Sequence, residues 1–192
     1  VNKKTFYFDS PYSTKSFIYN ILACVATLSV LNLNLEKIKK KFNNFKIPIG
    51  RGDIKVVKKF KKKFKFIDES YNANPLSMSS AIRNMSHHKI KKNSKKIAFL
   101  GDMLELGEKS KKFHKELSTV LNESDLDKIF VFGKHIKETY KRLSKHKKGK
   151  IFNNLTEAHG YFKKFINNND ILMIKGSNAT GLNQFSKNIK RI

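Results

Sequence analysis

The stretch FKFIDESYNANP, residues 64–75, decides the fold of this chain. It opens with large apolar side chains that predict a short buried strand. Two carboxylates, Asp68 and Glu69, stand where this strand is expected to end. Asn74 and Pro75 have the residue types of a helix N-cap and a first helical residue, because Asn accepts from a free helix N–H and Pro lacks the N–H that would stay unpaired. Acids, amides and a helix N-terminus thus converge at the carboxyl end of a strand, where open α/β sheets bind ligands.

Short apolar strands and amphipathic helices alternate outward from this stretch. We expect strands near residues 53–58, 63–68, 96–101, 128–132, 150–152 and 170–174. We expect helices near residues 75–87, 109–122, 134–144, 155–167 and 180–190. A lysine-rich segment at 59–63 indicates a hairpin-like turn between the first two strands. This order predicts an α/β fold with a mostly parallel sheet and helices on both faces.

The residues before this pattern form a separate part of the chain. We expect a strand at 4–8, a helix at 15–31 capped by Ser13 or Thr14, and a second helix capped by Asn34. The segment IPIGRG, residues 47–52, then interrupts the periodicity with Pro and Gly. We therefore place a domain boundary at residue 50, with one domain at 1–50 and another at 51–192.

Composition limits the classes of partner. The chain has 192 residues and a net charge of +26, which ordinarily suggests a nucleic acid or an anionic membrane surface as partner. The lysines, however, are spread along the whole chain without an Arg cluster, so we expect no specific nucleic-acid partner. A basic nucleic-acid binder remains an alternative hypothesis, while an anionic substrate is compatible with the same charge.

Cysteine content and the chain start bear on the setting of the protein. Cys24 is the only cysteine, which excludes an intramolecular disulfide and favours a reducing, cytoplasmic compartment. No apolar run reaches transmembrane length, so we expect no membrane insertion. Val1 stands where an initiator Met would be, from which we expect a fragment of a longer chain.

Three motifs, in this order, resemble the Mur ligase family of peptidoglycan synthesis. They are DESYNANP at 68–75, LGDMLELGE at 100–108 and KGS at 175–177. The resemblance covers nearly the whole chain, while the chain covers less than half of such an enzyme. It implies a complete Rossmann-like C-terminal Mur ligase domain, preceded by a remnant of the central ATP-binding domain.

The resemblance implies a nucleotide site. Glu69 would bind the ATP ribose with Asp68 as its neighbour, Arg51 would reach the nucleotide phosphates, and Asn20 would recognise adenine, although Ser16 stands where the family has His. The residues themselves also allow a plainer interpretation. In that view the two acids are a solvated pair at a strand end, Arg51 is a surface residue of a turn, and Asn20 is an exposed helical residue.

The resemblance also implies a site for the amine substrate. Lys175 would meet the carboxylate of D-alanyl-D-alanine, Ser177 would donate a hydrogen bond, and Asn72 and Asn74 would contact the substrates. A plain strand-to-helix turn at 175–177 and a pure capping role for Asn74 stay open. His114 also matches a family position, but its helical spacing favours packing over catalysis.

The parts that transfer phosphate are missing from these residues. Residues 176–181 have the Gly-x4-Gly spacing of a P-loop, but Leu182 and Asn183 replace its Lys and Ser/Thr. No His or Cys pattern indicates a metal site. The resemblance places the phosphate loop and the carboxylates that bind Mg²⁺ upstream, so no catalytic set is complete here.

We therefore expect the C-terminal part of a monomeric ATP- and Mg²⁺-dependent amide-bond ligase, inactive alone, whose intact form joins D-alanyl-D-alanine to UDP-N-acetylmuramoyl-tripeptide. Another Mur ligase, or a stand-alone α/β module that binds a nucleotide or a peptide, are the alternatives.

Overall fold

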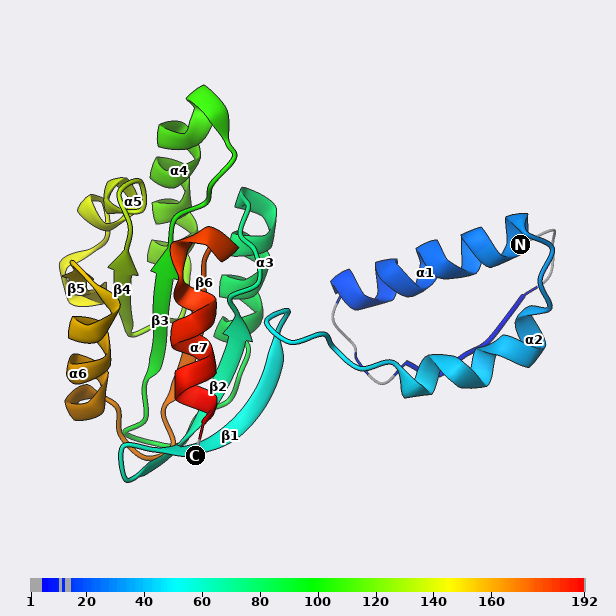
Figure 1. The fold of residues 1–192 in the computed structure, drawn as a ribbon, viewed down its shortest axis with the longest axis horizontal. Coiled ribbons are helices and arrows are strands. Elements are labelled where there is room, and N and C mark those ends of the chain that lie inside the picture. The colour runs from blue at the N-terminus through cyan, green and yellow to red at the C-terminus, as the bar shows by residue number, and fades with distance from the viewer. Residues whose placement is uncertain (1–4, 11, 13–14, 192) are drawn as a thin grey trace. The chain divides into compact units, whose positions relative to one another are not determined.

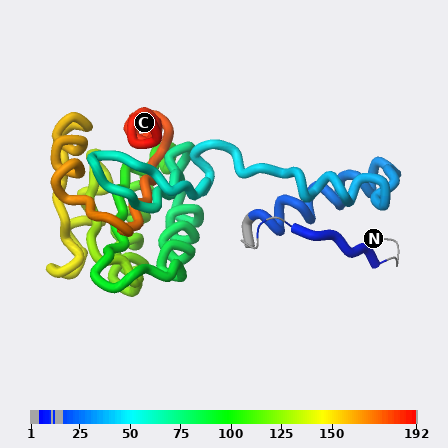
Figure 2. The backbone as a smooth tube through the Cα atoms, turned by 90° about the horizontal axis from the view of Figure 1, so that it is seen from below, coloured from blue at the N-terminus to red at the C-terminus, as the bar shows by residue number. Residues whose placement is uncertain are grey.

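The computed structural model describes residues 5–10, 12 and 15–191, and it divides the chain into two compact units, Val1–Ile47 and Pro48–Ile192. Figures 1 and 2 show both units. The first unit contains helix α1 (Lys15–Val30), the short helix α2 (Leu35–Ile38) and the 3-10 helix η1 (Lys39–Asn44). Asn34 caps α2 as expected, because its side chain accepts from the backbone N–H of Lys37 at 3.2 Å.

The strand predicted at 4–8 is wrong for its described residues. Residues 5–8 do not form a strand, and Lys4 and the two candidate caps Ser13 and Thr14 lie outside the described residues. Phe8 instead packs its ring against Phe42, with the ring centroids 5.4 Å apart. Side-chain packing therefore holds this segment where the sequence pattern suggested pairing in a sheet.

No helix in the described part of the chain combines the length and the apolar character needed to cross a membrane.

The second unit is built on a six-stranded sheet with the order β1-β2-β6-β3-β4-β5. The strands are β1 (Asp53–Lys59), β2 (Lys62–Glu69), β3 (Lys96–Gly101), β4 (Lys128–Phe132), β5 (Lys148–Phe152) and β6 (Ile171–Lys175). β1 pairs with β2 in antiparallel fashion, and the other neighbours are parallel. The predicted mostly parallel α/β sheet is confirmed, and so is the turn between β1 and β2, where Phe60 and Lys61 have φ values of 57° and 61°.

Helices cover both faces of this sheet. They are α3 (Pro75–Ser86), α4 (Ser110–Glu123), α5 (Lys137–Lys141), α6 (Leu155–Phe165) and α7 (Leu182–Lys190), joined by the 3-10 helices η2 (Gly107–Lys109), η3 (Lys145–Lys147) and η4 (Asn178–Thr180). The side chains of α3 and α4 form one apolar core with one face of the sheet, and those of α6 and α7 form a second core with the other (Figure 1). Strand β3 lies between them and is buried on both faces, as expected for a central parallel strand.

Helix α3 begins where the capping signal predicts. The Asn74 side chain accepts from the N–H of Ser77 at 2.8 Å, and the Ser77 hydroxyl accepts from the N–H of Asn74 at 3.0 Å. This reciprocal pair satisfies two helix N-terminal donors, with Pro75 at the first helical position.

Asn74→Ala should therefore destabilise the chain by about 1 kcal/mol, while Asn74→Asp should keep most of the stability. Urea denaturation of both variants checks this. Equal losses in the two variants would show that the amide does more than cap α3.

Candidate functional site

The candidate site lies at the carboxyl ends of β2, β6 and β3, which are neighbours in the sheet. The register places Glu69 opposite Lys175 on one side of β6 and Leu100 opposite Lys175 on the other. The loops that follow these three strands therefore leave the sheet at the same level. The three sequence motifs meet at this edge, although they are far apart in the chain.

Lys175 and Glu69 form the central ion pair of this edge. The Nζ of Lys175 lies 3.2 Å from Oε2 of Glu69 and donates to the backbone carbonyl of Asn72 at 3.0 Å. Lys175 is 2% exposed, and the Glu69 side chain is 22% exposed. One ammonium group therefore links the strand end to the loop at residues 70–74.

This pair is electrostatically costly. Burial raises the pKa of Glu69, although the charge of Lys175 opposes the change. Burial lowers the pKa of Lys175, although Glu69 opposes this change as well. Both shifts disfavour the charged forms, so desolvation outweighs the mutual attraction. Groups perturbed in this way are concentrated at functional sites.

Asp68 faces the opposite way and belongs to a second network. Its Oδ1 accepts from the hydroxyl and the N–H of Ser70, at 2.6 and 3.1 Å. Its Oδ2 lies 2.5 Å from Nζ of Lys190 on α7. The same nitrogen lies 3.1 Å from Oδ2 of Asp53. Burial would raise the pKa of Asp68, but the bonds from Lys190 and Ser70 lower it below its ordinary value. Asp68 is 1% exposed, and both its oxygens have partners within the protein.

The same network holds the segment that carries Arg51. Asp53 accepts from the N–H of Gly50 at 3.0 Å, and the carbonyl of Gly50 accepts from the N–H of Tyr71 at 3.0 Å. The guanidinium of Arg51 lies over the Tyr71 ring, 4.2 Å from its centroid. Gly52 has φ +97°, and a Cβ there would lie 2.9 Å from Oε1 of Glu69. Arg51 is therefore exposed on a turn that lies next to the candidate acid.

Ser177 joins all three loops. Its hydroxyl accepts from the N–H of Leu104 at 2.9 Å and donates to the carbonyl of Ala73 at 3.3 Å. Its N–H donates to the carbonyl of Asp102 at 2.9 Å. Ser177 is buried, so its hydroxyl fixes the loops to one another. Asn72, by contrast, is exposed, and its side chain accepts from the N–H of Ala73 at 2.8 Å.

The loop after β3 is held by Asp102 and His114. Asp102 accepts from the N–H groups of Lys134 and Ile136, at 2.9 and 2.7 Å. The helix predicted at 134–144 is wrong in its extent, because α5 spans only Lys137–Lys141 and begins directly after the residues that donate to Asp102. A side chain at Gly133, where φ is +140°, would clash with the Asp102 carboxylate.

His114 is fully buried and supports the same loop. Its Nε2 accepts from the N–H of Met103 at 3.1 Å, and its Nδ1 lies 2.8 Å from the carbonyl of Ser110. Burial lowers the pKa of His114, which favours the neutral ring that these two contacts require. Its contacts make it a positioning residue for residues 102–104.

Asn20 is an exposed residue of α1, in the first unit. Among the described residues, no group of three or more His, Cys, Asp and Glu side chains is arranged to hold a metal ion.

Sequence reasoning missed Lys190 and Asp53. Neither lies in a motif, and both look like ordinary surface charges at the ends of α7 and β1. The one available signal was the acid at the start of β1, which is weak because Asp is common in turns between elements.

Comparisons with known proteins agree with this architecture. The family model described as Mur ligase, glutamate ligase domain, matches residues 54–178. The UDP-N-acetylmuramoyl-tripeptide–D-alanyl-D-alanine ligase of Rickettsia prowazekii is 25% identical over 184 residues, which are 96% of this chain and 39% of that protein. The ligase of the same name from Buchnera aphidicola subsp. Acyrthosiphon pisum is 32% identical over 178 residues, which are 88% of this chain and 36% of that protein.

Solved structures show the same fold. The crystal structure of MurF ligase from Thermotoga maritima in complex with ADP is 25% identical and superposes with a TM-score of 0.71, over 93% of this chain and 39% of that one. MurF from Acinetobacter baumannii superposes with a TM-score of 0.77 at 24% identity, over 96% of this chain and 39% of that one. The chain thus spans about two fifths of the length of these relatives. Since the family model covers the greater part of the chain, the chain belongs to the Mur ligase family.

Proposed function

We propose that this chain is part of an ATP-dependent amide-bond ligase that joins D-alanyl-D-alanine to UDP-N-acetylmuramoyl-tripeptide in peptidoglycan synthesis. The supporting observation is the ion pair between buried Lys175 and partly buried Glu69 at the carboxyl edge of the sheet, where three loops meet. Relatives with that activity in their names match nearly the whole chain. On this proposal, residues 1–50 belong to the central ATP-binding domain and residues 51–192 form the C-terminal domain.

The chemistry divides between this chain and the rest of the ligase. In such a ligase ATP phosphorylates the tripeptide carboxylate, and the amine of D-alanyl-D-alanine then displaces phosphate from the acyl phosphate. The chain contributes binding and orientation to these steps. Phosphate binding and Mg²⁺, which dominate phosphoryl transfer, are assigned to the upstream part, so the chain alone is expected to show no turnover.

Lys175 is proposed to orient the amine substrate. An ammonium group has three N–H donors, and the contacts to Glu69 and Asn72 use two of them. The third is proposed for the carboxylate of a dipeptide, and Asn72, whose carbonyl accepts from Lys175, has an exposed side chain. Charge-assisted bonds of this kind are short and directional, which suits orientation of an attacking amine.

Glu69 and Arg51 are proposed to face the nucleotide. A carboxylate accepts from both ribose hydroxyls, and the exposed guanidinium of Arg51 fits phosphate oxygens. Asn20 is proposed to recognise adenine. Asp68, Ser177 and Asn74 are proposed to support these groups instead, because the carboxylate of Asp68, the hydroxyl of Ser177 and the amide oxygen of Asn74 are already bonded within the protein.

Kinetics of the intact ligase test this assignment. Lys175→Ala should raise the KM for D-alanyl-D-alanine by about ten- to a hundredfold, the value of a lost charge-assisted hydrogen bond. Glu69→Ala should raise the KM for ATP more than that for the dipeptide. Lys187→Ala, which removes an exposed lysine of α7, is the matched control. If Lys175→Ala left the KM for the dipeptide unchanged and raised the KM for ATP, the assignment of Lys175 to the amine substrate would be wrong.

A further inference from the structure

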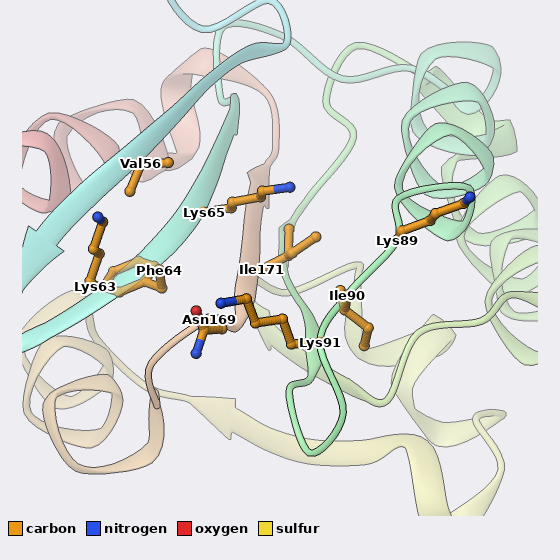
Figure 3. Close-up of a pocket in the computed structure, with 9 residues that line it drawn as sticks. All are labelled: Val56, Lys63, Phe64, Lys65, Lys89, Ile90, Lys91, Asn169 and Ile171. Carbon is orange, nitrogen blue, oxygen red and sulfur yellow. The ribbon is translucent and has the colours of Figure 1, made fainter.

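A separate pocket lies at the opposite end of the sheet from the candidate site. It has a volume of about 220 Å³ and lies at the start of β2 and β6, next to the segment that follows α3 (Figure 3). Its apolar lining consists of Val56, Phe64, Ile90 and Ile171. Phe64 and Ile171 are each 1% exposed and belong to the two apolar cores, so this floor is a rigid part of the fold.

The rest of the lining is cationic or an amide: Lys63, Lys65, Lys89, Lys91 and Asn169. In Figure 3, Lys65 and Lys91 extend across the pocket from opposite sides, Lys63 lies at one end, and the Lys89 side chain points away from the other lining residues. No ion pair or hydrogen bond of these four ammonium groups occurs among the described residues.

Among the residues that the structure describes, no carboxylate forms an ion pair with these four lysines. Asp170 is the acidic neighbour in sequence, but it is fully buried. Its two oxygens accept from the backbone N–H groups of Lys95 and Asn167, each at 2.8 Å. The positive charge of the pocket also affects His88. Burial lowers the pKa of His88, and the charge of Lys65 lowers it further.

We propose that this pocket binds a small organic anion that carries a doubly charged group, such as a phosphate, on an apolar body. The anionic group pairs with Lys65 and Lys91 and accepts from the Asn169 amide, and the apolar body lies on Phe64, Ile90 and Ile171. The pocket is smaller than the roughly 300–1,000 Å³ of drug-sized sites, which limits the ligand to about one ring system.

The site is independent of the proposed ligase activity, because its residues lie at the amino ends of the strands. Its test therefore uses the chain alone. The probe is 1-naphthyl phosphate, whose binding is followed by isothermal titration calorimetry and by shifts of backbone amide resonances. We expect saturable binding, with the largest shifts at residues 63–65, 89–91 and 169–171.

The variant Lys65→Gln/Lys91→Gln should weaken this binding by about tenfold, the loss of two partly exposed ion pairs. The matched control Lys163→Gln/Lys187→Gln removes the same charge from exposed positions of α6 and α7 on the opposite face, and it should bind within about twofold of the unmodified chain. Val56→Asp, at a position that is 59% exposed, adds an acid at the rim and should also weaken binding without unfolding the chain.

Three results would overturn the proposal. One is equal weakening in the pocket variant and the control, which would mean a diffuse charge effect. Another is an affinity for inorganic phosphate that equals the affinity for naphthyl phosphate, because the apolar floor would then contribute nothing. The third is the absence of saturable binding to the unmodified chain.

Discussion

Replacing Lys190 with methionine is expected to lower the free energy of unfolding by about 3–5 kcal/mol, the cost of removing one partner of a buried ion pair. Lys190 contacts both Asp68 and Asp53, and its loss leaves two carboxylates side by side with Asp68 almost completely buried. Hydrogen exchange of the β2 amides, together with urea denaturation, measures the loss. Lys187→Met, three residues earlier on the same helix, is the control and should change stability by less than about 0.5 kcal/mol.

The pH dependence of this loss has a definite sign. The folded pKa of Asp68 lies below its ordinary value of 3.8, so its contribution is present above pH 3.8 and is lost as pH falls through the folded pKa. Burial, the largest single effect, lowers the pKa of Lys190. The bonds to Asp68 and Asp53 together outweigh burial, so the folded pKa of Lys190 lies above its ordinary value of 10.5. Its contribution is present below pH 10.5 and is lost as pH rises through the folded pKa.

In Lys190→Met, Asp68 remains buried but no longer has the ammonium group of Lys190 as a partner. The pKa of Asp68 should therefore rise. The stability gap between the variant and the unmodified chain should then narrow as pH falls from 7 to 4, because protonation removes the unpaired charge. A gap that stays constant over this range would show that Lys190 stabilises by packing of its stem.

Replacing Lys175 with methionine is expected to lower the free energy of unfolding by about 3 kcal/mol, because Glu69 keeps a largely desolvated charge without its partner. Glu69→Gln should also be destabilising, since Lys175 is then buried as an unpaired cation. The double variant Lys175→Met/Glu69→Gln should lose less free energy of unfolding than Lys175→Met alone. It contains neither charge, so the desolvation that shifts both pKa values no longer destabilises the fold.

A double-mutant cycle measures this coupling, which we expect to be on the order of 1–3 kcal/mol. Additive effects of the two single substitutions would mean that the pair does not act as a unit. A double variant that is as stable as the unmodified chain but fails to support ligation in the intact enzyme would show that the pair is kept for function at the expense of stability.

The sequence by itself determined most of the elements of the second unit. Strand and helix positions follow from apolar periodicity, which depends on burial of neighbouring residues along one element. The Asn74 cap was equally predictable, because its bond to Ser77 spans three residues. The same local logic indicated that Asp68 and Glu69 stand at a strand end, and three motifs identified the family.

Tertiary structure alone decided which charges meet. Asp68 and Glu69 are adjacent in sequence but point to different partners, Lys190 on α7 and Lys175 on β6, because successive residues of a strand face opposite sides of the sheet. Asp102 accepts from backbone groups more than thirty positions away, directly before α5, at a point where the sequence pattern predicted a helix from residue 134. Phe8 packs on Phe42 rather than in a strand. Contacts of this kind depend on which segments the fold brings together, and periodicity within one segment carries no information about them.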